Sequence, residues 1–344
     1  MSVSARLARP ADDPEWNSFV EAHPLGTPFH LTAWRDCIEA TFGYKPRLIL
    51  AEGQGRLRGV LPLYLVSSPL AGRILLSSPF AVYGGVLAED EQAMQALKSA
   101  MEDLAREEGV QYVELRNAWE SQCLGYERVR RYVTFTHELK GTEEELLYTI
   151  PKKTRNLIRK SLKCNLTACR TEDLEPFYRL YFTNLRRLGT PAFPKHYFPR
   201  ILRAFGSSVY VLEIRHETRP VAAMLTFEHK GAIMPYYGAS DRDAHHLAPN
   251  NYLYWELMRS GLERGMRVLD FGRSKKMDDG VFFFKSQWGS QMRELPYEIL
   301  LVKRRSLPNL SPANPKFSPV IAMWKRLPLW LTNRLGPLLI KWVP

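Results

Sequence analysis

The residues best suited to chemistry lie in one stretch, LDFGRSKKMDDGVFFFKSQWG, at positions 269–289. A buried strand is expected to end at Asp270 and to break at Gly272, and Lys285 follows a run of aromatic residues. An acid at a strand end can orient or deprotonate an amine or hydroxyl, and a partly desolvated lysine can stabilise an oxyanion. A purely structural interpretation stays open, in which Asp270 pairs with Arg273 or a nearby lysine and holds the loop.

A second candidate is a basic segment, IPKKTRNLIRKSLK, at positions 150–163. It reads as a helix opened by proline, and Lys152, Arg155 and Arg159 share one face at spacings of three and seven. No acidic residue is interleaved with the basic ones. Uncompensated like charges on a helix cost stability, so the pattern favours a phosphate-binding surface over a solvated basic face. Lys153 is included in the predicted surface.

The elements that must position these residues form a pattern that occurs twice. Hydrophobic runs and turn residues predict three strands, a helix and a further strand between residues 46 and 116, and the same order between 209 and 272. The first copy has a strand ending at Gly84 and a helix ending at Gly109. Their counterparts, Gly238 and Gly265, lie 154 and 156 residues later. This nearly constant offset predicts one duplicated α/β unit, and the intervening segment 140–205 reads as mostly helical.

The C-terminal segment differs from both copies. Residues 316–344 carry lysines, arginines, leucines and three tryptophans but no acid, and prolines at 319, 328 and 337 should break the segment into short pieces. Short apolar helices with tryptophan and basic residues suit an in-plane position at a membrane surface. An arm packed on the body of the protein is the alternative.

Composition limits the classes of protein that this chain can belong to. It has 344 residues, enough for two domains, and 45% are hydrophobic, so cores rather than disorder are expected. A formal net charge of +12 favours polyanionic partners such as nucleic acid, anionic lipid or phosphate-bearing substrates. No apolar run approaches the roughly 20 residues needed to span a bilayer, and the four cysteines read as reduced thiols. We therefore expect a cytoplasmic protein, peripheral to the inner membrane if the C-terminal segment binds lipid.

Several other chemistries do not match the sequence. It contains no G-x-S-x-G, H-E-x-x-H or Walker A pattern. The side chains of the adjacent pair His245 and His246 should diverge, so no metal site is predicted. The loops 86–92 and 239–250, which follow the third strand of each copy, lack the glycine pattern that cradles the pyrophosphate of coenzyme A (CoA). That absence argues against ordinary acyl-CoA use.

The chain resembles the FemAB family of transferases. The resemblance rests on Asp270-Phe-Gly and on F-K-x-x-W-G at 284–289, and it is nearest to the FemAB-like branch associated with exosortase/PEP-CTERM systems. Further matching stretches cover nearly the whole chain, namely Tyr83-Gly84-Gly85, IPKKTRNLIRK (150–160), LGTPAFPKHYF (188–198), PYYGAS (235–240), NNYLYWELM (250–258), DFGRSK (270–275) and the segment 314–337.

This resemblance implies an α/β (α+β) chain of two tandem GNAT-like domains, at 1–140 and 141–310, and a basic amphipathic arm at 311–344. Each domain should hold a mixed, mostly antiparallel sheet flanked by helices. Known family members transfer amino acids from aminoacyl-tRNA to peptidoglycan precursors, and the lysine of the closing motif, here Lys285, is implicated in acyl transfer. The helical hairpin that some members insert has no counterpart here, which weakens the expectation of binding to the body of a tRNA.

The expected function is acyl or aminoacyl transfer to an amine or hydroxyl of a cell-envelope or exopolysaccharide-related acceptor, with no tightly bound cofactor. The donor is aminoacyl-tRNA or, alternatively, acyl-CoA or an acyl carrier protein; a non-catalytic scaffold that binds anionic membrane or RNA is the second alternative. The expected partners are tRNA, a small-molecule or lipid-linked acceptor, and the inner-membrane surface through 316–344. The predicted site comprises Lys285 and Asp270 as catalytic residues, Tyr236, Tyr237, Arg273, Lys275, Asn251 and Trp288 as substrate-binding residues, and Lys152, Lys153, Arg155 and Arg159 as phosphate-binding residues.

Overall fold

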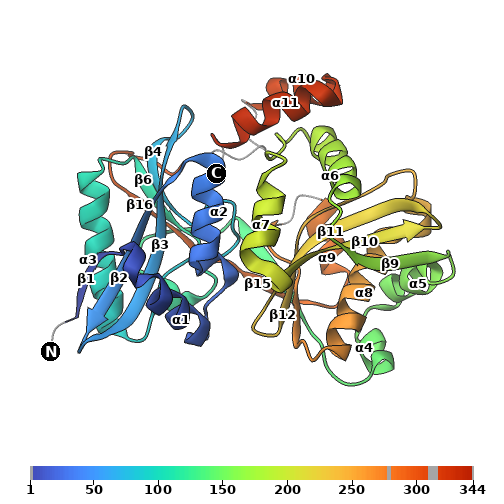
Figure 1. Ribbon diagram of the computed structural model, residues 1–344, viewed down its shortest axis with the longest axis horizontal. Coiled ribbons are helices and arrows are strands. Elements are labelled where there is room, and N and C mark those ends of the chain that lie inside the picture. Colours follow the sequence, from blue (N-terminus) through green and yellow to red (C-terminus); the bar gives the residue numbers. More distant parts are fainter. Residues whose placement is uncertain (1–2, 277–279, 309–316, 343–344) are drawn as a thin grey trace. The chain divides into compact units, whose positions relative to one another are not determined.

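The computed structural model describes residues 3–276, 280–308 and 317–342, and its chain forms two compact units (Figure 1). Unit 1 comprises Met1–Arg130, Leu295–Ile321 and Arg334–Pro344, and unit 2 comprises Arg131–Glu294 and Ala322–Asn333. The units are thus interleaved along the chain, because it returns to unit 1 after unit 2. The consecutive ranges expected from the sequence, 1–140, 141–310 and 311–344, stay a prediction about domains, and residues 311–316 and 343–344 of the expected arm lie outside the described part.

Unit 1 is built on a mostly antiparallel sheet in the order β1-β2-β3-β4-β6-β16-β7, and β5 pairs with β3. Its elements are β1 (Ser4–Leu7), α1 (Asp13–Ala22), α2 (Thr32–Phe42), β2 (Lys45–Gly53), β3 (Arg56–Ser68), β4 (Gly72–Ser77), β5 (Leu87–Ala88), α3 (Glu91–Glu107), β6 (Tyr112–Leu115), β7 (Glu127–Val129) and β16 (Tyr297–Leu301). β2 and β3 form an antiparallel hairpin. Its turn residues Gln54 and Gly55 both have positive φ, as the tight turns that match strand twist require.

Unit 2 holds the second sheet, in the order β14-β8-β13-β12-β11-β10-β9, and β15 pairs with β8. Its elements are β8 (Tyr132–Glu138), α4 (Glu143–Thr149), α5 (Lys152–Ser161), β9 (Leu166–Thr171), α6 (Glu175–Leu188), α7 (Tyr197–Phe205), β10 (Val209–His216), β11 (Arg219–His229), β12 (Ala232–Ser240), α8 (Pro249–Glu263), β13 (Val268–Asp270), β14 (Ser274–Lys275), α9 (Gly280–Ser286) and β15 (Gln291–Glu294). The prediction of a mostly helical segment at 140–205 missed β9, whose largely exposed residues carry little hydrophobic signal.

The repeated order is the same in both units, β2-β3-β4-α3-β6 in unit 1 and β10-β11-β12-α8-β13 in unit 2. In each copy the first three strands pair antiparallel. The third and last strands pair parallel through two residue pairs, Leu75–Val113 and Leu76–Glu114 in unit 1, and Ala232–Val268 and Ile233–Leu269 in unit 2. The predicted fold class, two mixed and mostly antiparallel sheets flanked by helices, is confirmed.

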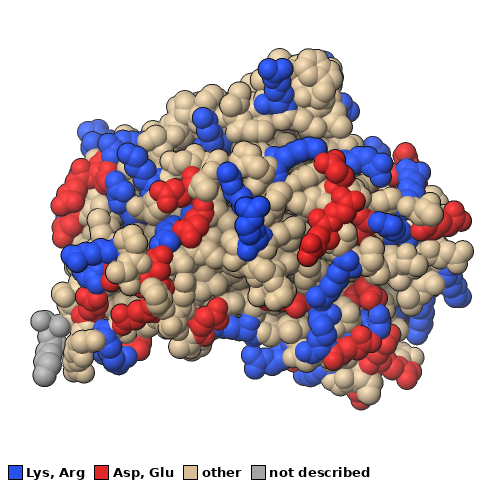
Figure 2. All heavy atoms as spheres, in the orientation of Figure 1, with Lys and Arg blue, Asp and Glu red and all other residues tan. Residues whose placement is uncertain are grey.

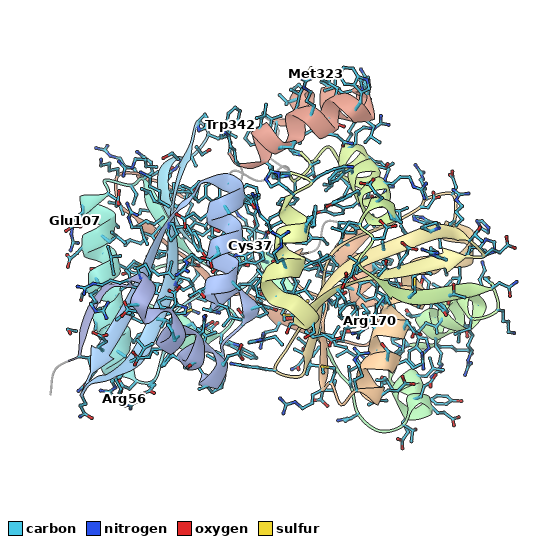
Figure 3. The ribbon with its side chains drawn as sticks, in the orientation of Figure 1. Cys37, Arg56, Glu107, Arg170, Met323 and Trp342 are labelled. Atoms are coloured by element: carbon cyan, nitrogen blue, oxygen red, sulfur yellow. The ribbon has the colours of Figure 1, made fainter. Side chains whose placement is uncertain are left out.

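The C-terminal segment forms two helices, α10 (Ser318–Arg326) and α11 (Leu329–Ile340). Pro328 separates them as expected, but the expectation that Pro337 breaks the chain is wrong, because this residue lies inside α11. Apolar side chains on both helices are more than half exposed, namely Val320, Met323, Trp330 and Leu338. Met323 is labelled on these helices in Figure 3, and Figure 2 shows basic but no acidic side chains on their visible face. Among the described residues, no helix is both long enough and apolar enough to span a bilayer.

Candidate active site

The candidate site lies where the parallel strands β12 and β13 part. Only Ala232 and Ile233 of β12 pair with β13, and β12 then continues to Ser240 while β13 ends at Asp270. Backbone groups on strands that separate are available to hydrogen-bond a ligand. Ligands of open α/β sheets also bind beyond the carboxyl ends of strands. Asp270 is the residue at that end of β13.

The Asp270 carboxylate is buried and oriented by two hydrogen bonds. Asp270 is only 8% exposed. Oδ1 accepts a hydrogen bond from Thr134 Oγ1 at 2.8 Å and another from the Gly272 amide, also at 2.8 Å. Thr134 lies on the neighbouring strand β8, so the sheet itself sets the direction of this acid. Sequence reasoning missed Thr134, because nothing local to residues 132–138 indicates which strand they join.

The Lys285 ammonium reaches the same turn from α9. It is 6% exposed, and Nζ donates to the carbonyl oxygens of Gly272 at 2.9 Å and of Arg273 at 3.1 Å. Asp270 therefore binds the amide of Gly272 while Lys285 binds its carbonyl. The acid and the ammonium, fifteen positions apart in the sequence, meet at one residue. The residues 277–279 between them lie outside the described part of the chain.

An aromatic cluster packs against α9, the helix that carries Lys285. Tyr254 of α8 stacks on Phe271 at a centroid distance of 5.1 Å, and Trp288 lies 5.7 Å from Tyr254 and 5.9 Å from Phe284. Trp288, which we expected to bind substrate, is completely buried in this cluster. It therefore acts as packing that fixes the end of α9, a role for which large rigid aromatic side chains are suited.

The closing motif 284–289 is also attached to the start of α5. Thr154 Oγ1 donates to the carbonyl oxygen of Gln287 at 2.6 Å. Gly289 has a φ of +69°, and a Cβ added there would lie 2.8 Å from the carbonyl oxygen of Thr149. Only glycine fits this backbone without strain. The structure thus joins two segments that the sequence analysis singled out separately, the basic helix and the lysine motif.

The four predicted phosphate-binding residues occupy the outer part of α5. Lys152, Lys153 and Arg159 are exposed, whereas Ile158 on the opposite face is buried. Arg155 is partly engaged, because its guanidinium lies 4.6 Å from the centre of the Tyr148 ring. No acidic side chain pairs with the three exposed residues in the part of the chain that the structure describes. This face keeps the uncompensated positive charge that the sequence predicted.

Comparisons with known proteins agree with this fold. An "Acetyltransferase (GNAT) domain" family matches residues 147–286. A lipid II:glycine glycyltransferase of Staphylococcus haemolyticus is 21% identical over 81% of this chain and 89% of its own length. The chain is a homologue of this FemAB-type glycyltransferase. The crystal structure of FemX superposes with a TM-score of 0.68 at 17% identity, covering 87% of this chain and 98% of FemX. A tandem GNAT protein from the clavulanic acid pathway gives 0.50 at 12% identity, covering 87% and 98%.

The predicted homology to FemAB-type transferases, the tandem GNAT-like fold and the enzyme class are therefore confirmed: this homologue is an acyltransferase. Its assignment to the exosortase/PEP-CTERM-associated branch stays a prediction, as do the roles of its individual site residues. What the geometry adds is where those residues lie.

The two tyrosines in the middle of β12 have different environments in this transferase. Tyr237 is 6% exposed within an aromatic cluster, and its hydroxyl lies 3.1 Å from that of Tyr197. Burial raises the pKa of Tyr237 well above its ordinary value, so the phenol stays protonated. Tyr236, whose ring lies 4.8 Å from that of Tyr237, is half-buried and packs edge-on against Phe227 at 5.5 Å. Tyr236 is thus the more accessible of the two.

The remaining predicted substrate residues flank the turn after Asp270. The Arg273 guanidinium lies 4.7 Å from the centre of the Tyr132 ring on β8. Lys275 is half-buried in β14, opposite the same Tyr132. Asn251, near the start of α8, is 8% exposed. The turn is therefore lined by basic groups on the β8 side.

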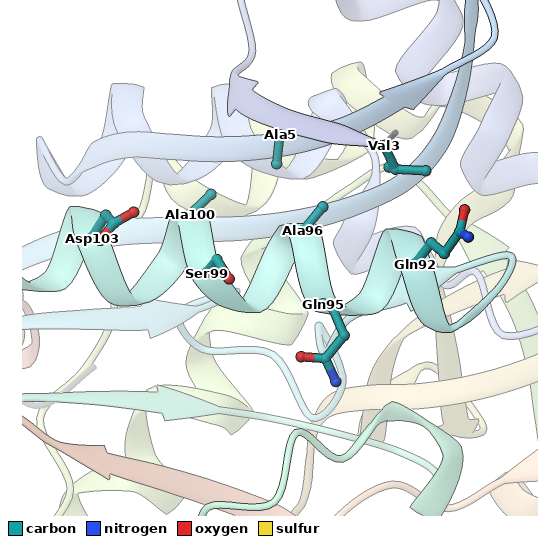
Figure 4. A pocket seen from close by; sticks show the side chains of 8 residues that line it. All are labelled: Val3, Ala5, Gln92, Gln95, Ala96, Ser99, Ala100 and Asp103. Atoms are coloured by element: carbon teal, nitrogen blue, oxygen red, sulfur yellow. The ribbon is translucent and has the colours of Figure 1, made fainter. Parts of the chain in front are cut away.

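Two surface hollows lie away from these residues. One of about 540 Å³ lies between β1 and α3 in unit 1, and Figure 4 shows its small and neutral lining of alanine, serine and glutamine with a single acid, Asp103. Another of about 550 Å³ is lined by Glu144, Glu145 and neighbours on α4. Neither includes a predicted site residue. Within the described ranges, no group of three or more His, Cys, Asp or Glu side chains could hold a metal ion.

Proposed function

We propose that this FemAB-type transferase moves an aminoacyl group from aminoacyl-tRNA to an amine or hydroxyl of a lipid-linked cell-envelope acceptor. The observation that carries the proposal is the meeting of a buried carboxylate and a buried ammonium at Gly272, beside the parting strands. The glycyl transfer to lipid II named for the staphylococcal relatives supports an aminoacyl group and a lipid-linked acceptor. An acceptor related to exopolysaccharide or exosortase systems is the finer form of the proposal.

The proposed reaction uses the two charged groups, Lys285 and Asp270. The acceptor nitrogen or oxygen attacks the ester carbonyl carbon of the donor, and the carbonyl oxygen becomes an oxyanion. The Lys285 ammonium stabilises that charge in a site with little water, where a fixed cation is worth most. Asp270 takes the acceptor's proton. The ester C–O bond then breaks, and Asp270 returns the acceptor's proton to the departing ribose oxygen, so that a new amide or ester and a free tRNA end are formed.

Alignment contributes as much as the charged groups. Backbone groups of β12 beyond Ile233 can hold an extended donor or acceptor against the turn at which Asp270 and Lys285 meet. Converting a two-molecule encounter into an oriented one supplies much of a transferase's rate. Tyr236, Arg273 and Lys275 are proposed to contact the substrates, and Asn251 to orient one of them from α8.

The exposed charges of α5 are proposed to bind the phosphates near the 3′ end of the tRNA. Lys152, Lys153 and Arg159 project from a helix whose start is fixed to the lysine motif through Thr154 and Gln287. Phosphate contacts of this kind position a nucleic acid without reading its sequence. Acyl-CoA or an acyl carrier protein as donor is the competing proposal, and a scaffold without turnover is a third.

A membrane-surface role for α10 and α11 completes the proposal, because a lipid-linked acceptor is found at a bilayer. Their exposed apolar residues, Trp330 (68% exposed) among them, stand beside exposed Lys325, Arg326 and Arg334. Such a surface suits the interface of an anionic membrane. The end of α11 is anchored within unit 1, since Tyr44 Oη donates to the Lys341 carbonyl at 2.6 Å and Ser68 Oγ to the Trp342 carbonyl at 2.7 Å.

The test is a transfer assay with the purified full-length protein. Radiolabelled aminoacyl-tRNA, acyl-CoA or acylated carrier protein is supplied with lipid-linked muropeptide acceptor, and product is followed by mass spectrometry. We expect product from aminoacyl-tRNA alone, and Lys285→Met to abolish most of it. Product from acyl-CoA or the carrier protein alone would overturn the proposed donor. Absence of product from every donor, with salt-sensitive tRNA binding retained, would favour the scaffold.

The membrane role has its own test. Flotation with anionic and with neutral vesicles should recover the protein with the anionic ones, and Met323→Ser combined with Trp330→Ser should abolish recovery. Equal recovery of this variant and the unaltered protein would rule out α10 and α11 as the contact.

A further inference from the structure

A third hollow, of about 540 Å³, lies in unit 2 between α6, the start of β11 and the end of β12 (these elements are labelled in Figure 1). One face of α6 forms its wall, because residues 179, 183 and 187 are spaced by four. The opposite wall is Arg219 with Pro220, and the turn Ser240–Asp243 closes one end. None of its lining residues belongs to 270–289, so it is separate from the candidate active site.

The lining carries four arginines and two aspartates, a balance of +2. Arg219 forms an ion pair with Asp241. The other Asp241 oxygen accepts a hydrogen bond from the Asp243 amide at 3.0 Å, and Arg187 Nη2 donates to Asn184 Oδ1 at 2.6 Å. Arg179 and Arg242 form no ion pair with an acid in the described part of the chain. The N–H donors of Arg179 and Arg242 are thus not used by an acid. They lie on a concave surface beside Arg187 and Arg219.

The local field at this place is positive. The pKa of His245, which follows the turn, is lowered by burial first and then by the charges of Arg187 and Arg242. Like charges gathered around one hollow repel one another, and a bound anion removes that repulsion. Guanidinium groups match phosphate oxygens in geometry and donate two hydrogen bonds to each partner. Thr183, Asn184 and Ser240 add neutral hydrogen-bonding groups to the lining.

We propose that this hollow binds the phosphate groups of a small phosphate-bearing ligand, with Arg179 and Arg242 as the principal contacts. Its volume lies in the range of small-molecule sites, about 300–1,000 Å³, and is larger than one phosphate needs. Two linked phosphates, as in a diphosphate ester, suit four arginines placed on opposite walls. This site goes beyond the proposed transfer reaction and does not depend on Lys285 or Asp270.

The test is titration of the full-length protein with inorganic pyrophosphate and, separately, with inorganic phosphate and citrate, followed by calorimetry at fixed ionic strength. We expect saturable binding of pyrophosphate that is tighter than that of phosphate or citrate. Arg179→Gln and Arg242→Gln should each weaken it about ten-fold, since each removes one charge-assisted contact. Arg203→Gln, which changes an exposed arginine on α7 outside the hollow, is the matched control and should leave the affinity within two-fold.

Two outcomes would overturn the proposal: no saturable binding of pyrophosphate, or equal weakening by Arg203→Gln. The Lys285→Met variant separates this proposal from the proposed function. Pyrophosphate binding that persists in a Lys285→Met protein without transfer activity supports the hollow as an independent site. Loss of pyrophosphate binding in that variant would place the anion at the turn near residue 272 and overturn the assignment to the hollow.

Discussion

The same strand arrangement ends in two chemically different ways in the two units. In unit 1 the parallel pair β4–β6 is followed by Arg116, which is 3% exposed. Its amide donates to Ser77 Oγ at 2.7 Å, and its guanidinium Nη1 donates to the carbonyls of Ser78 at 3.3 Å and Ala81 at 3.1 Å. The side chain that follows β6 therefore bonds to the chain that follows β4, and the parting strands are tied together.

A buried carboxylate completes this closure in unit 1. Glu298 of β16 is completely buried and accepts hydrogen bonds from the amides of Leu124, Gly125 and Tyr126 at 2.7–2.9 Å, and from Asn117 Nδ2 at 3.0 Å. These four donors come from the segment after β6. The acid is used to hold a loop, which is the structural role that the sequence analysis had kept open for Asp270.

In unit 2, by contrast, the acid and the cation after β13 meet at a turn beside β8 rather than across the gap to β12. The comparison teaches that topology alone does not make a site. The carboxylate and the cation come from different elements in the two units, from β16 and the segment after β6 in unit 1, and from β13 and α9 in unit 2. Their hydrogen-bond partners decide whether they tie the strands together or stand beside them. We expect the chemistry to reside in unit 2.

The largest expected effect separates the two cations. Lys285→Met should lower kcat about 10²- to 10³-fold, because the variant loses the positive charge proposed for the oxyanion. Arg116→Met in unit 1 should leave kcat within two-fold and lower the free energy of unfolding by about 2–4 kcal/mol, because it leaves buried carbonyls without donors. Steady-state kinetics and denaturant unfolding of both variants provide the measurements. A similar fall in kcat in both variants would contradict the division of roles.

The next effect separates the two acids. Asp270→Asn keeps an oxygen for Thr134 and Gly272 but removes the charge, so kcat should fall about 10²-fold with little change in stability. Glu298→Gln should instead cost about 2 kcal/mol of unfolding free energy, because an amide replaces a carboxylate oxygen among backbone donors. The measurement is kcat beside the midpoint of thermal unfolding. Destabilisation by Asp270→Asn without loss of kcat would assign Asp270 the same structural role as Glu298.

The smallest effect concerns the contact between the closing motif, residues 284–289, and the start of α5. Gly289→Ala should destabilise the protein by about 1–2 kcal/mol through its positive φ and should raise KM for the proposed tRNA donor several-fold, because α5 must shift away from the added Cβ. The matched control in unit 1 is Gly43→Ala, with a φ of +71° and no atom within 4 Å of the added Cβ. It should show the same stability loss and an unchanged KM. Equal KM values in the two variants would show that α5 takes no part in donor binding.

The sequence by itself determined the local features of this protein. Helix caps, the turn at Gln54 and Gly55, the repeated strand order and the identity of Asp270 and Lys285 as an acid and a cation near one turn are all recorded in neighbouring residues. Only the tertiary structure decided that Thr134 orients Asp270, that β16 returns to unit 1, and that Trp288 is buried. The physical reason is that pairing between distant strands depends on the register and burial of whole sheets. Thr134 and Asp270 are 136 residues apart, and no local periodicity or cap indicates such a partner.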